Sequence, residues 1–172
     1  MTKAKPAASS RPGKRVSESA AEMVEVVLPN DTNPLGKVLG GRVMHLIDMA
    51  GAIAAHRHSR RHVVTASMDE LHFLSPIKVG QLIILRSSVN YVSRSSMEVG
   101  VKVLSENILT GERRHTSTAY LTFVAIDENG KPSEVPPLVL ETAEERRRHR
   151  EAVERRKHRL ARRAKLLKQD LE

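Results

Sequence analysis

The spacing of apolar residues predicts one helix followed by several strands. Between Gly40 and His58, in GGRVMHLIDMAGAIAAHRH, apolar side chains cover nearly the whole circumference of a helix, which is typical of a helix buried inside a domain. Upstream, Met23–Leu28 is rich in β-branched and apolar residues, which predicts a first strand that ends at Pro29. The segment 30–36, NDTNPLG, is dense in turn-forming residues and is predicted to be a loop.

After the helix the pattern changes to that of strands. Apolar and polar residues alternate, wholly or in part, through four segments separated by turn-forming residues: Val63–Leu74, Gln81–Val92, Ser96–Leu104 and His115–Ile126. No helical pattern lies between these segments, so we predict an antiparallel meander. One all-apolar helix and one antiparallel sheet bury each other when the sheet wraps the helix, which predicts an α+β fold.

The chain divides into one folded domain and three flanking segments. Residues 1–20 are small, polar and basic and are predicted to be a disordered tail, whereas residues 21–131 hold the domain. Residues 132–141 are predicted to be an extended linker. Residues 142–172 are predicted to form a basic, charged helix that opens with a T-x-x-E capping box.

The apolar stripe of this last helix is thin and consists of Val153, Leu160, Ala164, Leu167 and Leu171. We therefore predict a solvated helix with a narrow docking seam. The alternative is a helix that contacts a ligand or a second subunit.

Composition narrows the class of protein further. The 172 residues suit one domain with tails, and 40% apolar but only 2% aromatic residues require an aliphatic core. The net charge of +9 is concentrated in residues 141–172 and the aromatic residues are scattered singly, so nucleic acid is not an expected partner. The sequence shows no cysteine and no segment typical of a membrane span, so we expect a cytoplasmic protein that does not bind membranes.

Asp48 is the most informative residue for chemistry, because it lies between Ile47 and Met49 in the apolar helix. Burying an isolated carboxylate is costly, so Asp48 must be paired or face a polar cleft. It is either an acid on a wet edge of the helix or a general base or nucleophile in a pocket. Gly40 and Gly41 open the same helix. They either shape a turn or allow a ligand to approach unpaired N–H groups, which can hold a developing oxyanion.

Other chemistries find little support in the sequence. It contains no G-x-S-x-G elbow, P-loop or dinucleotide fingerprint. His56, His58 and His62 lie among arginines and are predicted to belong to a solvated helix end rather than to a metal site. We therefore expect neither a metal nor a cofactor.

The stretch DTNPLGKVLGGRVMHLIDMAGAIAA closely resembles the signature of hotdog-fold acyl-CoA thioesterases, which include the bacterial YciA-type enzymes and the cytosolic brain-type acyl-CoA hydrolases. Two later segments, VVTASMDELHFLSPIKVG and VNYVSRSSMEVGVKV, agree in order, so the resemblance covers about residues 22–130. It implies a hotdog fold, protomers that pair edge to edge in dimers or in hexamers made of three dimers, and active sites at the dimer interface.

The resemblance also implies roles for single residues. Asp48 resembles the catalytic acid of one protomer, and Asn33 resembles the loop amide that orients water or substrate from the partner chain. Gly41, with Gly40, would point backbone N–H groups at the thioester carbonyl. Thr65 lies beside the site with at most a supporting role, and the loop that contacts the CoA nucleotide is matched by Arg94, Ser95 and Ser96.

The function implied is hydrolysis of fatty acyl-CoA to a free fatty acid and CoA, without a cofactor. The alternative is a hotdog protein that senses acyl-CoA or contacts RNA through its basic tail without turnover. The joint presence of Asn33, Gly40, Gly41 and Asp48 favours the enzyme. A hotdog dehydratase would be expected to use a histidine in the loop before the helix, and the sequence between Pro29 and Val43 contains none.

Overall fold

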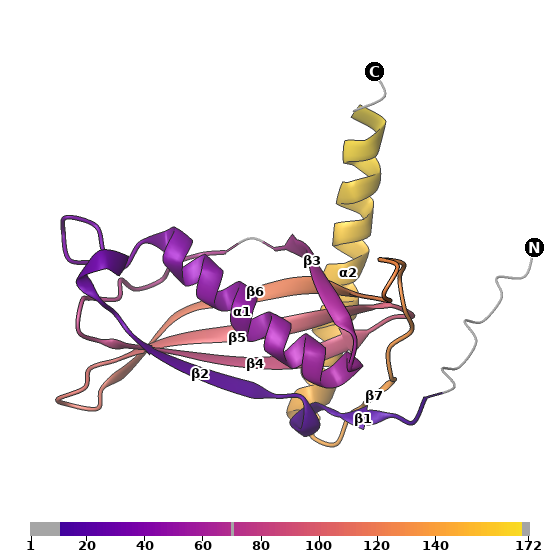
Figure 1. Cartoon of the computed structure of the whole chain (residues 1–172), viewed down its shortest axis with the longest axis horizontal. Coiled ribbons are helices and arrows are strands. Elements are labelled where there is room, and N and C mark those ends of the chain that lie inside the picture. The colour runs from indigo at the N-terminus through magenta and orange to yellow at the C-terminus, as the bar shows by residue number, and fades with distance from the viewer. Residues whose placement is uncertain (1–10, 70, 170–172) are drawn as a thin grey trace, which may run out of the picture.

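Helix α1 lies on one face of a curved antiparallel sheet, and helix α2 crosses the opposite face (Figure 1). The computed structural model describes residues 11–69 and 71–169. The sheet contains β2 (Ala21–Val26), β3 (His62–Met68), β4 (Leu82–Val92), β5 (Ser96–Glu106) and β6 (Arg113–Ile126). The helices are α1 (Gly40–Ser59) and α2 (Ala143–Gln169), and the short elements are β1 (Lys14–Arg15), β7 (Leu138–Val139) and the 3-10 turns η1 (Val16–Glu18) and η2 (Pro29–Asp31).

The strand order of the sheet is β2-β4-β5-β6-β3. Strands β4, β5 and β6 form the expected meander, but β3 is not beside β4 and instead pairs with β6 at the far edge. The prediction of one meander through all four strands is therefore wrong for β3. The reason is that α1 contacts all five strands, from β2 to β3, and delivers the chain to the opposite edge.

Strand β3 is also shorter than predicted, because it ends at Met68 instead of continuing to Leu74. Its pairing with β6 shifts register between Thr65 and Ser67. Apart from this change, the helix and strand boundaries follow the pattern of the sequence within a few residues. An α+β fold with a sheet wrapped around one helix is confirmed.

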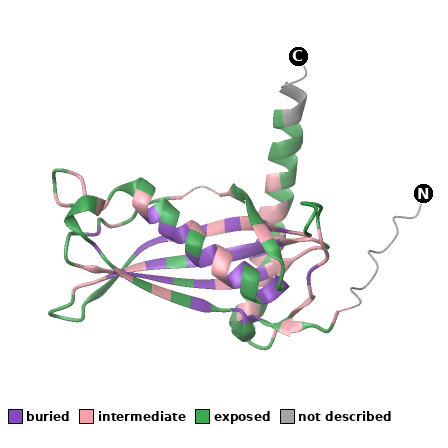
Figure 2. Ribbon diagram, in the orientation of Figure 1, coloured by how far each residue is buried: buried purple, intermediate pink, exposed green. Residues whose placement is uncertain are grey.

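The core fills the space between α1 and the sheet and is aliphatic apart from Phe123. Figure 2 shows buried residues on the strands and on the side of α1 that faces them. The outer side of α1 is open, with Met44 45% and Met49 40% exposed. The prediction that α1 is buried all round therefore fails within one protomer, which leaves apolar surface for another contact.

Helix α2 is held on the sheet mainly by ion pairs and hydrogen bonds rather than by the predicted apolar stripe. The carboxylate of Glu98, only 1% exposed, lies 2.7 Å from a guanidinium nitrogen of Arg155 and 2.7 Å from one of Arg159. Arg155 also stacks 3.6 Å above the ring of Tyr120. The capping box is confirmed, because Glu145 N–H donates to Thr142 Oγ1 and Thr142 N–H donates to Glu145 Oε2.

Two of the flanking segments contain short ordered elements, one in residues 11–20 and one in the linker at residues 132–141. Strand β1 pairs in parallel with β7, and Val16 is buried, so the prediction of disorder is wrong for residues 14–20 and the linker includes a strand. Hydrogen bonding to the linker supplies the order that a polar sequence alone does not predict. Residues 1–10 lie outside the described residues. Within the described part, neither helix has the length and apolar character needed to cross a membrane.

Candidate active site

Asp48 of α1 meets Thr65 of β3. The Thr65 hydroxyl donates a hydrogen bond of 2.6 Å to Oδ1 of Asp48. Asp48 is half-buried, and within the described part of the chain its Oδ2 makes no hydrogen bond. One carboxylate oxygen is thus fixed by Thr65 while the other is available for chemistry. His45, one turn earlier on the helix, is exposed and makes no hydrogen bond to Asp48.

Thr65 therefore contacts Asp48 directly, which is a closer involvement in the site than the sequence indicated. It lies on the edge strand opposite Phe123 of β6. The prediction gave it at most a supporting role, because nothing in the sequence tells which helix residue a strand hydroxyl will meet. A hydroxyl in the strand directly after the helix was the only signal.

Asn33 belongs to the loop between η2 and α1, and its side chain shapes that loop. Oδ1 of Asn33 accepts hydrogen bonds from the N–H groups of Leu35 and Lys37, at 3.0 and 3.1 Å. The amide Nδ2 makes no hydrogen bond to any described residue and can donate to a ligand. Asn33 and Gly40 line the same cavity of about 370 Å³.

The remaining walls of this cavity are largely apolar and include Val38, Val43, Phe73, Leu74 and Ile77. Phe73 and Leu74, which are 47% and 65% exposed, were not singled out by the sequence. They fall in a segment predicted to be strand, and leave the sheet because β3 ends early. An apolar wall beside polar donors suits the acyl part of a thioester.

Gly40 and Gly41 supply the free donors expected at the start of α1. The N–H groups of Arg42 and Val43 are bonded to the Leu39 carbonyl, whereas those of Gly40 and Gly41 make no hydrogen bond to the described residues. Leu39 caps the helix without a side-chain hydrogen bond. A Cβ at Gly41 would meet no atom within 4 Å, whereas a Cβ at Gly40 would lie 3.4 Å from Cε2 of Phe73.

These residues form two separate groups within one protomer. Asp48 and Thr65 are joined by a hydrogen bond, and Asn33 and Gly40 share a cavity whose lining includes neither Asp48 nor Thr65. No hydrogen bond connects the two groups across residues 11–69 and 71–169. A chemically complete site therefore needs either movement or a second chain.

Arg94 and Ser95 lie in the turn between β4 and β5, and Ser96 is the first residue of β5. This turn is at the end of the sheet away from the start of α1 (Figure 1). The turn is fixed by its backbone, because Ala125 N–H donates to the Ser95 carbonyl and Val135 N–H to that of Arg94. The side chain of Arg94 is exposed and makes no ion pair with a described residue. It is therefore available to an anionic ligand.

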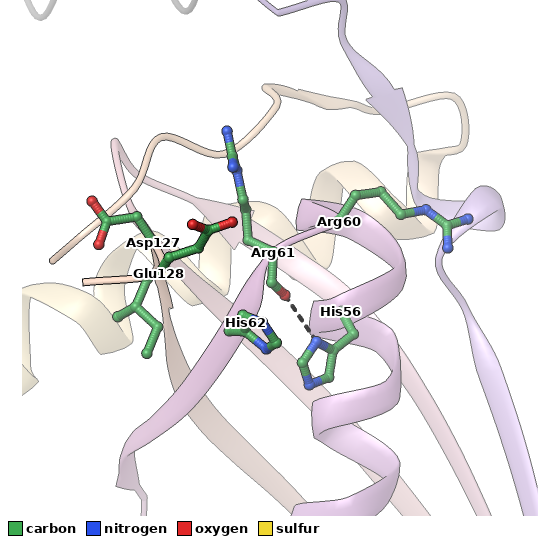
Figure 3. A pocket seen from close by; sticks show the side chains of 7 residues that line it. His56, Arg60, Arg61, His62, Asp127 and Glu128 are labelled. Carbon is green, nitrogen blue, oxygen red and sulfur yellow. Dashed lines mark hydrogen bonds between the residues drawn. The ribbon is translucent and has the colours of Figure 1, made fainter. Parts of the chain in front are cut away.

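Figure 3 shows a second cavity, of about 380 Å³, where α1 ends and β3 begins. His56 donates from Nδ1 to the Arg61 carbonyl at 2.8 Å, and His62, Asp127 and Glu128 line the same cavity. The described residues contain no group of three or more His, Cys, Asp or Glu side chains suited to hold a metal ion.

His58 departs from the predicted solvated helix end. It is fully buried, and its Nε2–H donates to the Pro136 carbonyl at 3.0 Å, while Nδ1 has no partner among the described atoms. Burial lowers the pKa of His58 below its ordinary value, because the charged ring cannot be solvated there. His58 therefore has a structural role in holding the linker against α1.

Comparison with known proteins identifies relatives along most of the chain. Residues 35–112 match the sequence profile of the Thioesterase superfamily. The chain is 49% identical, over 138 residues and 80% of both chains, to a Bacillus subtilis (strain 168) protein named uncharacterized acyl-CoA thioester hydrolase YkhA.

Solved structures extend the likeness to the fold. A Staphylococcus aureus acyl-CoA hydrolase in complex with butyryl-CoA, CoA and CoA disulfide is 38% identical, with a TM-score of 0.86 over 91% of this chain and 96% of the other. An apo-hexameric acyl-CoA thioesterase is 42% identical, with a TM-score of 0.86 over 90% of this chain and 99% of the other. Further structures of the Staphylococcus aureus enzyme carry alanine in place of an aspartate, a threonine or an asparagine.

The sheet wrapped around a central helix, with a carboxylate on that helix, defines a hotdog-fold protein of the thioesterase class. With the extent of these matches, the chain belongs to the Thioesterase superfamily, in its acyl-CoA thioester hydrolase family.

Proposed function

We propose that this protein is an enzyme that hydrolyses fatty acyl-CoA, with Asp48 as general base or nucleophile at a site completed by Asn33 of a second protomer. The observation that carries the proposal is the Asp48 carboxylate, whose Oδ1 accepts a hydrogen bond from Thr65 and whose Oδ2 makes no hydrogen bond to the described residues. Asn33 Nδ2 and the N–H groups of Gly40 and Gly41 are the matching free donors. Twofold pairing brings one set to the other.

The general-base route uses each of these groups once. Oδ2 of Asp48 takes a proton from water, and the resulting hydroxide forms a bond to the thioester carbonyl carbon. The carbonyl oxygen becomes an oxyanion and accepts hydrogen bonds from the N–H groups at the start of α1. The C–S bond then breaks, CoA leaves as thiolate, and Asp48 releases its proton, while Asn33 keeps water and substrate aligned.

The nucleophilic route begins with attack of Asp48 Oδ2 on the carbonyl carbon. Loss of CoA thiolate gives a mixed anhydride, and water then cleaves it to the fatty acid and the free carboxylate. A single turnover in oxygen-labelled water tests the nucleophilic route, because label enters Asp48 only if an anhydride forms and water attacks its aspartyl carbon. Label in Asp48 overturns the simple general-base route, whereas label found only in the fatty acid fits that route and also an anhydride that water opens at the acyl carbon.

The comparisons support the choice of residues. The aspartate, threonine and asparagine replaced in the Staphylococcus aureus enzyme are spaced along that chain as Asp48, Thr65 and Asn33 are spaced here. That enzyme was obtained with CoA ligands, and a similar thioesterase is hexameric. We therefore also propose a homodimer, assembled in threes as a hexamer, with acyl-CoA as substrate and contacted at its nucleotide by Arg94, Ser95 and Ser96. The cytoplasmic location stays a prediction.

Release of free thiol from acyl-CoA by the purified protein tests the proposal. Asp48→Asn keeps an oxygen for Thr65 but cannot accept a proton, so we expect kcat to fall about 10²- to 10⁴-fold. Glu112→Gln is the matched control, since it makes the same chemical change at an exposed ion pair whose residues do not line the cavity of Asn33 and Gly40. Wild-type kcat in Asp48→Asn overturns the proposal, and tight acyl-CoA binding without thiol release favours a sensor instead.

A further inference from the structure

The distal part of α2 extends past the sheet that supports the rest of the helix. Figure 1 shows α2 crossing the sheet and continuing beyond β3, its edge strand. The last side chain that holds it down is Arg159, whose Nη1 lies 2.8 Å from Asp69, directly after β3, and 2.7 Å from Glu98. We call residues 160–169 the overhang; at the helical rise they add about 15 Å.

The overhang lacks the support that the proximal half of α2 has. Its described side chains, at residues 160–166, are all exposed, with Leu160 47% and Leu166 53% exposed. None of them makes a hydrogen bond or ion pair with the described part of the chain. Exposed leucines at the unsupported end of a helix leave apolar surface for contact with another protein surface.

The helical repeat shows which side of the overhang would face such a surface. Ala152 is fully buried, and Arg155 and Arg159 contact the sheet, so these residues mark the supported side of α2. At 3.6 residues per turn the same side continues through Arg162 or Arg163 to Leu166. Ala161 lies on the opposite side, in line with the exposed Glu154 and Lys157.

The sheet of a second copy of this chain would offer such a surface. Strand β3 is an edge strand, paired only with β6 among the described strands, and Val64 on it is 46% exposed. Twofold pairing through β3 continues the sheet antiparallel beyond that edge, where the overhang runs. Arg155 already stacks on Tyr120 of this face, so a strand surface suits the side chains of α2.

We propose that the overhang of each protomer docks on the outer face of its partner's sheet, so that α2 bridges the dimer on the side opposite α1. The occupant is a second copy of this chain, contacted through Leu166 and the neighbouring arginines. This inference rests on the dimer of the proposed function but concerns a contact outside the active site.

The absence of cysteine from the sequence makes a direct test available. Leu166→Cys and Ala161→Cys each place one thiol on the overhang, on the docked and the open side. In the dimer we expect an uncharged thiol reagent to label Leu166→Cys at least about tenfold more slowly than Ala161→Cys, because a buried thiol reacts only when the contact opens. Equal labelling rates in a dimer overturn the proposal.

A second pair of variants tests the energy of the contact. Leu166→Glu places a charge on the docked side, and we expect the dimer dissociation constant from analytical ultracentrifugation to rise at least about tenfold. Ala161→Glu adds the same charge on the open side and should leave that constant near the wild-type value. An unchanged constant in Leu166→Glu contradicts docking, and binding of RNA that depends on Arg162 and Arg163 assigns the overhang to nucleic acid instead.

The outcomes separate this inference from the proposed function. If thiol release from acyl-CoA persists in a dimer whose overhang labels freely, only the overhang contact is wrong. If ultracentrifugation shows a monomer at working concentrations, the shared dimer is wrong and both proposals fall.

Discussion

At the scale of single residues, hydrogen bonding determines which polar atoms remain available to a ligand. Thr65 donates to Oδ1 of Asp48, and loop N–H groups donate to Oδ1 of Asn33. Oδ2 of Asp48 and Nδ2 of Asn33 make no hydrogen bond to the described residues. His58 is the opposite case, because its Nε2–H is used and its other ring nitrogen, Nδ1, is buried without a donor among the described residues. Free groups at the first two positions suit catalysis, whereas the third fixes the fold.

His58 makes stability depend on pH. Its pKa is lowered in the folded state, so on acidification the unfolded chain binds a proton that the folded chain refuses. The stability that the uncharged His58 contributes is fully present above the ordinary histidine pKa of about 6.5. It falls as the pH drops below that value towards the folded pKa. We therefore expect the free energy of unfolding in urea to decrease from pH 7 to pH 5.

His58→Gln cannot titrate but can still donate to Pro136. We expect it to cost about 1 kcal/mol at pH 7 and to reduce the difference between pH 7 and pH 5. The exposed His56 provides the comparison, since His56→Gln should keep that difference. An undiminished pH dependence in His58→Gln would assign the effect to other groups.

Close approach between elements sets the geometry of the site. Helix α1 contacts the sheet at Gly51, where a Cβ would lie 3.0 Å from Cε2 of the fully buried Phe123. This contact fixes the height of the helix above β6, and hence of Asp48 beside Thr65 on β3. At the start of α1, in contrast, a Cβ at Gly41 would meet no atom within 4 Å.

The two glycines should respond oppositely to the same substitution. Gly51→Ala forces a methyl group against Phe123, and we expect a loss of about 1–3 kcal/mol in the free energy of unfolding. Gly41→Ala meets no neighbour, so it should keep stability or raise it by up to about 1 kcal/mol through helix propensity. Denaturant titration of both variants measures this, and an unchanged free energy of unfolding in Gly51→Ala would show that α1 or Phe123 shifts to accommodate the methyl group.

At the scale of the whole molecule, the two groups of site residues lie apart. The pair Asp48–Thr65 and the pair Asn33–Gly40 do not meet in one chain, and α1 and β3 leave Met44, Met49 and Val64 exposed on the same protomer. These exposed apolar residues, beside site residues that lie apart, are the reason for proposing that association and catalysis use one surface.

Dimers made of two different variant chains test whether each site draws on both protomers. In a dimer of Asp48→Asn with Asn33→Ala chains, one site carries both changes and the other carries neither, if each site draws on two protomers. We expect such heterodimers, isolated with two different affinity tags, to show about half of the wild-type thiol release. The homodimer of either variant should release thiol far more slowly than the heterodimer. Activity in the heterodimer no higher than the average of the two homodimers would show that Asp48 and Asn33 serve the same protomer.

The sequence by itself determined the elements of this protein and the residue types of its site. Apolar periodicity is a local property, so it predicted α1 from Gly40 and the long strands β4 to β6. The helix-opening glycines and the charge at Asp48 were visible for the same reason. The family resemblance added Asn33 and the pairing of protomers, which stay predictions.

Only the tertiary structure decided how the elements meet. Strand β3 pairs with β6 because α1 crosses the sheet, and this crossing gives Asp48 its contact with Thr65. His58 is buried because the linker returns over it, and α2 docks through Glu98 because Arg155 and Arg159 converge there. These are contacts between residues distant in the chain, and the pattern of a segment carries no information about which distant residue it will meet.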